Sequence, residues 1–103
     1  MKHDAWLTEQ LHDDAFAAAY LTQAAQDLEP SVFTAALRAV IDARGGLAKV
    51  AEAGGLSRQS LYRSLSPTGN PTARTLFAAM RAAGLQISIT PPEQRVPPQH
   101  AGR

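Results

Sequence analysis

The sequence predicts a mainly α-helical fold: a bundle of five helices that includes a helix-turn-helix, followed by a short C-terminal β-strand. Three observations support this prediction. Alanine is frequent, and apolar residues recur at helical spacing between residues 13 and 83. Glycine and proline interrupt this pattern at the points where helices are expected to end. Beyond residue 84, apolar and polar residues alternate, which is typical of a strand.

Length and composition limit the kind of protein this is. A chain of 103 residues is expected to form one domain with a modest core. It contains no cysteine, which excludes disulfides and cysteine-based metal sites. No apolar run is long enough to cross a bilayer, and acidic residues interrupt the N-terminal stretch where a signal peptide would be apolar. We therefore expect a cytoplasmic protein with no membrane partner.

The first part of the chain is ambiguous. Residues 1–12 form either an N-terminal arm or a short amphipathic turn, and the domain itself is assigned to residues 13–90. The first helix is expected to begin at Asp13 or Asp14, either of which can cap it, and to run to about Leu28. Its apolar stripe consists of Phe16, Tyr20, Ala24 and Leu28.

A second helix is expected from about Ser31 to Ala43. Pro30 ends the preceding helix and can start this one, because its fixed φ suits a first helical turn. Gly45 and Gly46 are expected to terminate it. The residues predicted to be buried on this helix are Phe33, Leu37, Val40 and Ile41.

Residues 45–65, GGLAKVAEAGGLSRQSLYRSL, have the spacing of a helix-turn-helix, with helices predicted over residues 47–53 and 58–65. Gly55 occupies the turn, where a positive φ costs glycine least. Ser57 can cap the second helix by accepting a hydrogen bond from a free amide of its first turn. Apolar or small residues fill the interior positions, namely Ala51, Leu56, Leu61 and Leu65.

The remaining elements are a loop, a last helix, a strand and a tail. The loop covers residues 66–71, SPTGNP, and Thr72 caps a helix to about Ala83 that is expected to bury Leu76, Phe77 and Met80. Gly84 ends this helix. Residues 85–90 are predicted to form the strand, through alternating Leu85, Ile87 and Ile89, and residues 91–103 are expected to be a disordered tail.

A lone strand must pair with something, because its backbone amides need partners. Three partners are open: the N-terminal arm, the same strand of a second subunit, or a strand of another protein. Pairing with a second subunit is attractive because helix-turn-helix domains usually read two half-sites as symmetric dimers. We therefore expect a homodimer, formed through the final helix, the strand, or both.

Charge is divided unevenly along the chain. Residues 1–43 hold seven acidic and two basic residues, a net charge of −5. Residues 44–81 hold six basic residues, Arg44 among them, and one acidic residue, a net charge of +5. The positive segment coincides with the helix-turn-helix, and a basic region is the electrostatic footprint of a phosphate-backbone ligand.

These features predict binding to double-stranded DNA. Residues near the start of the second helix of the motif have side chains that can reach base edges in a major groove: Arg58, Gln59, Ser60 and Tyr62, with the cap Ser57 beside them. Others are better suited to phosphates, which position the protein without specifying sequence: Lys49, Arg63, Thr68, Asn70 and Arg74.

The sequence does not predict an enzyme, a cofactor or a metal site. The three histidines, His3, His12 and His100, share no motif, and there is no metal-binding, phosphate-loop or nucleophile-elbow signature. Trp6 is the one large residue expected to be exposed. It either closes the edge of the core or anchors an interface.

The stretch FAAAYLTQAAQD, followed by FTAALRAVIDARGGLAKVAEAGGLSRQSLYRSLSPTGNPTARTLFAAMRAAGL, resembles a family of bacterial addiction-module antidote proteins. These are antitoxins with an Xre-like (λ-repressor-like) helix-turn-helix, encoded beside a RelE/ParE-type toxin. The resemblance covers about residues 13–89, and LSRQSLYR–LSPTGNP is its most specific part. It implies a dimer, binding of operator DNA that represses the chain's own operon, and neutralisation of the cognate toxin. Ser64 departs from the general Xre pattern, where an apolar residue is usual, and Leu65 is expected to take over its packing.

Toxin binding is assigned to the acidic N-terminal region, with Trp6, Leu7 and Leu11 as apolar anchors. A toxin that cleaves RNA must carry positive charge, which an acidic surface could cover. Two alternatives remain open: a stand-alone helix-turn-helix regulator without a toxin, and a helical protein-interaction module that binds no nucleic acid. A neighbouring gene for a small basic protein would separate the first from the antitoxin, and salt-dependent DNA binding would exclude the second.

Overall fold

The computed structural model describes residues 2–92, with side chains from residue 5 onward, and contains six helices and no strand in that range. The helices are α1 (Lys2–Gln10), α2 (Asp14–Ala25), α3 (Pro30–Ala43), α4 (Leu47–Gly54), α5 (Arg58–Ser64) and α6 (Ala73–Ala82). The mainly helical fold class is therefore confirmed, with one helix more than expected. No helix in the described part of the chain combines the length and apolar character needed to span a bilayer.

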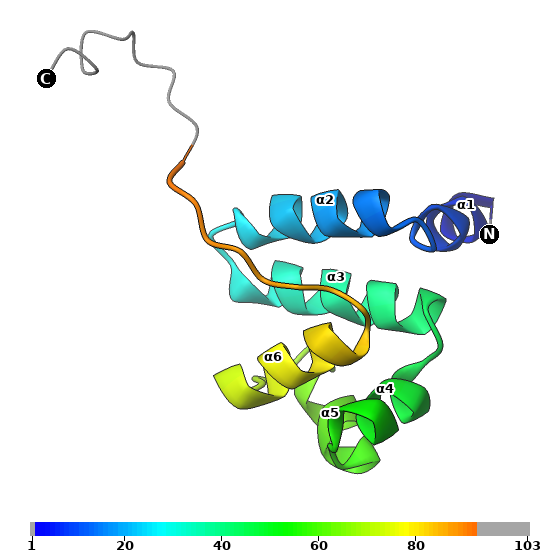
Figure 1. The fold of residues 1–103 in the computed structure, drawn as a ribbon, viewed down its shortest axis with the longest axis vertical. Helices are drawn as coiled ribbons and strands as arrows, with labels where there is room; N and C mark the ends of the chain where they lie inside the picture. The colour runs from blue at the N-terminus through cyan, green and yellow to red at the C-terminus, as the bar shows by residue number, and fades with distance from the viewer. Residues whose placement is uncertain (1, 93–103) are drawn as a thin grey trace, which may run out of the picture.

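The helices form two groups (Figure 1). α2 and α3 run antiparallel to each other, and α1 packs against α3 beside the start of α2. On the other side of α3, α4 packs against α3, α5 and α6. α3 therefore lies between the N-terminal helices and the group formed by α4, α5 and α6.

Helix boundaries follow local chemistry. The Asp13 carboxylate caps α2 by accepting hydrogen bonds from the amides of Ala15 and Phe16, at 2.8 and 3.2 Å. Pro30 is the first residue of α3. The Thr72 hydroxyl caps α6 by accepting from the Thr75 amide at 3.1 Å. These three starts agree with the sequence to within a residue.

The core is apolar and continuous across both groups of helices, and no buried polar or charged residue occurs among residues 5–92. Its fully buried large side chains are Leu11, Leu37, Val40, Ile41, Val50 and Leu61. Small residues let helices approach closely: a Cβ added at Gly54 on α4 would lie 3.3 Å from the Ala78 carbonyl oxygen on α6.

The sequence mispredicted the ends of the first helical region. Residues 2–10 form a helix, so this segment does not extend as an arm that could pair with a strand. α2 ends at Ala25, and Leu28 is 99 % exposed in the turn to α3. The reason is local, because the Asp27 carboxylate accepts a hydrogen bond from the Glu29 amide and favours a turn there. The fully buried positions of α2 are Ala17 and Leu21, with Phe16, Tyr20 and Ala24 partly buried beside them.

Two further expectations fail near the C-terminus. Met80 is buried and Leu76 is partly buried, as expected, but Phe77 is 47 % exposed because the buried face of α6 is formed by Ala79 and Met80. Residues 85–92 form no strand. The Leu85 amide donates to the Met80 carbonyl at 2.9 Å and closes α6, but beyond it this segment makes no backbone hydrogen bond to another described residue. A strand requires a neighbouring strand, and residues 2–92 offer none. The expected tail lies largely in residues 93–103, outside the described residues.

Candidate nucleic-acid interface and a second surface

The turn between α4 and α5 is a tight turn centred on Gly55, at the place where the sequence predicts the turn of a helix-turn-helix. Gly55 adopts the left-handed conformation, with φ 67° and ψ 32°, and the Leu56 amide donates to the Ala51 carbonyl at 2.8 Å. The Ser57 hydroxyl then accepts from the Ser60 amide at 3.2 Å and starts α5. Ala51, Leu61 and Leu65 are buried as the spacing predicts.

Ser64 and Leu65 divide the end of α5 between a polar and an apolar contact. The Ser64 side chain is half-buried and donates a hydrogen bond to the Leu61 carbonyl at 3.2 Å, while Leu65 is buried in the core. Leu65 thus supplies the apolar contact at the end of α5, as expected.

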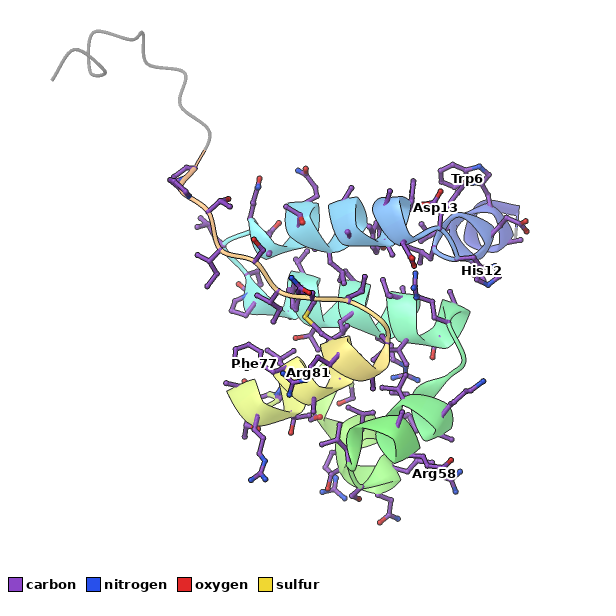
Figure 2. The ribbon with its side chains drawn as sticks, viewed as in Figure 1. Trp6, His12, Asp13, Arg58, Phe77 and Arg81 are labelled. Carbon is purple, nitrogen blue, oxygen red and sulfur yellow. The ribbon has the colours of Figure 1, made fainter. Side chains whose placement is uncertain are left out.

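The residues predicted to contact DNA are all exposed. They come from α4 (Lys49), the start and outer face of α5 (Ser57, Arg58, Gln59, Ser60, Tyr62, Arg63), the loop to α6 (Thr68, Asn70) and the start of α6 (Arg74). Arg58 lies at the edge of the molecule that α4 and α5 form (Figure 2). This arrangement presents cationic and amide side chains from a short, well-capped helix, with cations on both neighbouring helices.

Tyr62 has a partner that the sequence did not predict. The Arg38 guanidinium, on α3, lies over the Tyr62 ring with its Cζ 4.9 Å from the ring centroid. Arg38 also pairs with Asp42, one turn later on α3, at 3.4 Å. The spacing of four residues between Arg38 and Asp42 would have predicted their ion pair. The contact between Arg38 on α3 and Tyr62 on α5 could not be predicted from the sequence, because it depends on how the two helices cross.

Arg44 does not belong to the positive surface, although it counts toward the positive segment of the sequence. Its side chain is 15 % exposed. Nε donates to the Ala83 carbonyl at 3.1 Å, Nη1 donates to the Leu11 carbonyl at 3.2 Å, and Nη2 pairs with Asp14. Arg44 therefore joins the ends of α1, α3 and α6 to the start of α2.

A second surface lies on α1 and α2. Trp6 is 53 % exposed and meets Phe16 edge to face, with ring centroids 5.9 Å apart. Phe16 in turn stacks on Tyr20, with centroids 6.3 Å apart. We call Trp6, Phe16 and Tyr20 the aromatic row. The sequence placed Phe16 and Tyr20 in the core, but both are only partly buried.

The other two anchors proposed from the sequence are less accessible. Leu7 is half-buried against the core, and Leu11 is 1 % exposed within it. Leu11 therefore cannot contact a partner while α1 stays packed. Trp6 lies beside α1 and Arg58 lies at the edge formed by α4 and α5, so the two side chains are far apart in Figure 2.

A third feature is an apolar groove of about 340 Å³ between α2, α3, α6 and the segment that follows α6. Leu21, Phe33, Met80 and the side chains of residues 85–89 line it. Three apolar side chains near it are exposed, Phe77, Ile87 and Ile89, the last to 92 %. No group of three potential metal ligands occurs among the residues whose side chains are described; His12 is exposed there, and His3 and His100 lie outside them.

Comparison with known proteins gives two matches. A family model described as "Probable addiction module antidote protein" matches residues 2–91. An uncharacterized protein of Haemophilus influenzae is 32 % identical over 83 residues, which cover 81 % of this chain and 84 % of that protein. No solved structure matches the chain.

Proposed function

Because the chain belongs to the family of probable addiction module antidote proteins, we propose that it is an antitoxin with two separate activities. One is binding of a RelE/ParE-type toxin, and the other is binding of operator DNA that represses its own operon. The observation that carries the proposal is the separation of two unlike surfaces. Exposed cations and amides surround α5, and Trp6 of the aromatic row is far from Arg58 in Figure 2.

DNA binding is supported by the exposed face of α5. Arg58 and Gln59 begin this helix, and in this class of motif the start of the second helix enters the major groove. Arginine and glutamine can each make two hydrogen bonds to one base, which is worth about 1–3 kcal/mol of discrimination. Lys49, Thr68, Asn70 and Arg74 flank the helix and suit phosphate contacts.

Toxin binding is supported by the aromatic row and by the acidic balance of the N-terminal sequence. A half-exposed tryptophan that meets a neighbouring ring edge to face offers the type of anchor that carries much of an interface's energy. Residues 1–43 have a net charge of −5, which would draw in a basic toxin and raise the association rate. We assign the contact to Trp6 with Phe16 and Tyr20, and we leave Leu11 to the core.

Dimerisation is supported by the segment after α6. Residues 86–92 make no backbone hydrogen bond to another described residue, and Ile87 and Ile89 expose apolar side chains on one edge of the molecule. A second copy of the segment, paired antiparallel about a two-fold axis, would supply hydrogen-bond partners for the backbone and cover the two isoleucine side chains. The homodimer would also present two copies of α5 to two half-sites.

The DNA-binding activity is tested with the duplex upstream of the chain's own gene. Binding of a labelled duplex, followed by fluorescence anisotropy, should weaken steeply as salt rises. Arg58→Ala combined with Gln59→Ala should remove the preference for this duplex over a random one and leave the melting temperature unchanged. Undiminished discrimination by the double variant would contradict the assignment of α5 as the reading helix.

A further inference from the structure

Arg38, on α3, contacts the outer face of α5 through Tyr62. Its guanidinium lies over the Tyr62 ring, and its Nε is 3.4 Å from each carboxylate oxygen of Asp42. The donors on its two Nη atoms make no hydrogen bond to a described residue. The side chain is 29 % exposed, so these donors can meet a ligand.

The contact with Tyr62 leaves the Arg38 guanidinium able to bind phosphate. Only Nε contacts Asp42, so the N–H donors of both Nη atoms stay available for hydrogen bonds in the plane of the group. A planar fork of N–H donors matches the oxygens of a phosphate. A ring beneath the guanidinium also restricts its rotation, so less side-chain entropy is lost when the phosphate binds.

We propose that Arg38 is a phosphate-binding residue of the DNA interface that acts as a unit with Tyr62. This inference rests on the proposed DNA binding. Arg38 lies outside the helix-turn-helix, and Tyr62 holds its guanidinium beside α5. The expected ligand is a backbone phosphate of the same duplex that α5 reads.

The Asp42 carboxylate competes with a DNA phosphate for the guanidinium of Arg38. In the free protein this exposed carboxylate is the acceptor that pairs with Arg38. When DNA binds, the phosphate oxygens take over this guanidinium, and the carboxylate returns to solvent. Removing the charge of Asp42 should therefore tighten DNA binding, and should do so only while Arg38 is present.

The first arm of the test measures affinity as a function of salt. Arg38→Gln should weaken binding to the upstream duplex and to a random duplex by the same factor, about tenfold at low salt. It should also reduce the slope of log K against log salt by about 0.9, the value for one phosphate contact. Arg81→Gln is the matched control, because it removes the same charge from an exposed position near the end of α6. It should leave the slope unchanged.

The second arm separates a DNA contact from a structural one. Arg38→Lys keeps the charge but not the planar fork, so it should keep the salt slope while losing part of the affinity. Asp42→Asn should tighten binding in the wild-type background and have no effect in the Arg38→Gln background. If Asp42→Asn tightens DNA binding equally with and without Arg38, Asp42 acts only through its contribution to the net charge of the protein.

The outcomes distinguish this inference from the proposed function. If Arg38→Gln leaves the salt slope at the wild-type value while Arg58→Ala with Gln59→Ala abolishes discrimination, α5 reads DNA and Arg38 only joins α3 to α5. If the wild-type chain shows no salt-dependent binding to either duplex, the proposed DNA-binding function is wrong. The proposed role of Arg38 is then wrong as well.

Discussion

The side chain of Arg44 connects the ends of four helices. Its three groups of donors are used by two main-chain carbonyls and one carboxylate, at the junction of α1, α2, α3 and α6. Unlike the exposed cations of α5, it is almost enclosed. A residue that contributes positive charge to the sequence thus serves the packing of the fold.

Replacing Arg44 with methionine should destabilise the protein by about 2–3 kcal/mol, because the Leu11 and Ala83 carbonyls would lose their hydrogen bonds in a partly buried site. Asp14→Asn should cost less than about 1 kcal/mol, since Asp14 is exposed and water screens its pairing with Arg44. Urea unfolding of both variants, with Arg81→Gln as the control, measures the difference. A loss for Arg44→Met no larger than that of the control would mean that this junction contributes little to stability.

At the scale of a helix and its turn, Gly55 is the position most constrained by backbone geometry. Its φ of 67° lies in the left-handed region, and a Cβ there would meet no other atom within 4 Å. Gly55→Ala should therefore cost about 1–2 kcal/mol from backbone strain alone. Gly46→Ala has equally open surroundings but φ 92° and ψ 162°, a region that essentially only glycine adopts, so it should destabilise more than Gly55→Ala. Thermal unfolding in which Gly55→Ala matches the wild type would contradict the assigned turn geometry.

The sequence was sufficient to predict elements whose ends are set by local chemistry. Asp13, Ser57 and Thr72 cap helices by hydrogen bonds to amides two or three residues away, and Gly55 supplies a conformation that glycine adopts readily. The buried leucines of α5 followed from a spacing of four residues. Each of these features depends on residues that are near one another in the chain.

The sequence was insufficient where the outcome depends on contacts between distant residues. Phe77 fits an apolar helical stripe, but the packing of α6 buries Ala79 and Met80 and leaves Phe77 exposed. Leu28 is a different case, because the local turn at Asp27 ends α2 before it. Alternation in residues 85–90 predicted a strand, but alternation gives no information on whether a partner strand is present. For the candidate site, the exposed residues of α5 were predictable, whereas the contact of Arg38 with Tyr62 required the crossing of α3 and α5.

At the scale of the whole molecule, the segment after α6 should control association. Ile87→Asp, combined with Ile89→Asp, would place charges on the proposed contact between two copies, and burying them without partners is unfavourable. We expect sedimentation to show a dimer for the wild type and a monomer for this variant. The melting temperature should fall only by the contribution of association, and should lose its dependence on protein concentration, because both side chains are exposed in the single chain. A wild type that sediments as a monomer at micromolar concentration would contradict the proposed dimer.

Trp6 is the residue that best isolates the toxin surface. Its exposure and its edge contact with Phe16 indicate that Trp6→Ala should cost only about 1 kcal/mol of stability. Its loss from an interface should cost about 2 kcal/mol or more of toxin affinity, roughly thirtyfold. A thermal melt of the variant keeps these two effects apart. A stable variant with unchanged toxin affinity would exclude the aromatic row as the anchor.

The proposed antitoxin has two separable binding surfaces. They are tested together by the affinity of two variants, Trp6→Ala and Arg58→Ala with Gln59→Ala, each for the proposed operator duplex and for the cognate toxin. We predict that the first variant loses toxin affinity and keeps operator affinity, and that the second does the reverse. Parallel loss of both affinities in either variant, at an unchanged melting temperature, would contradict the account.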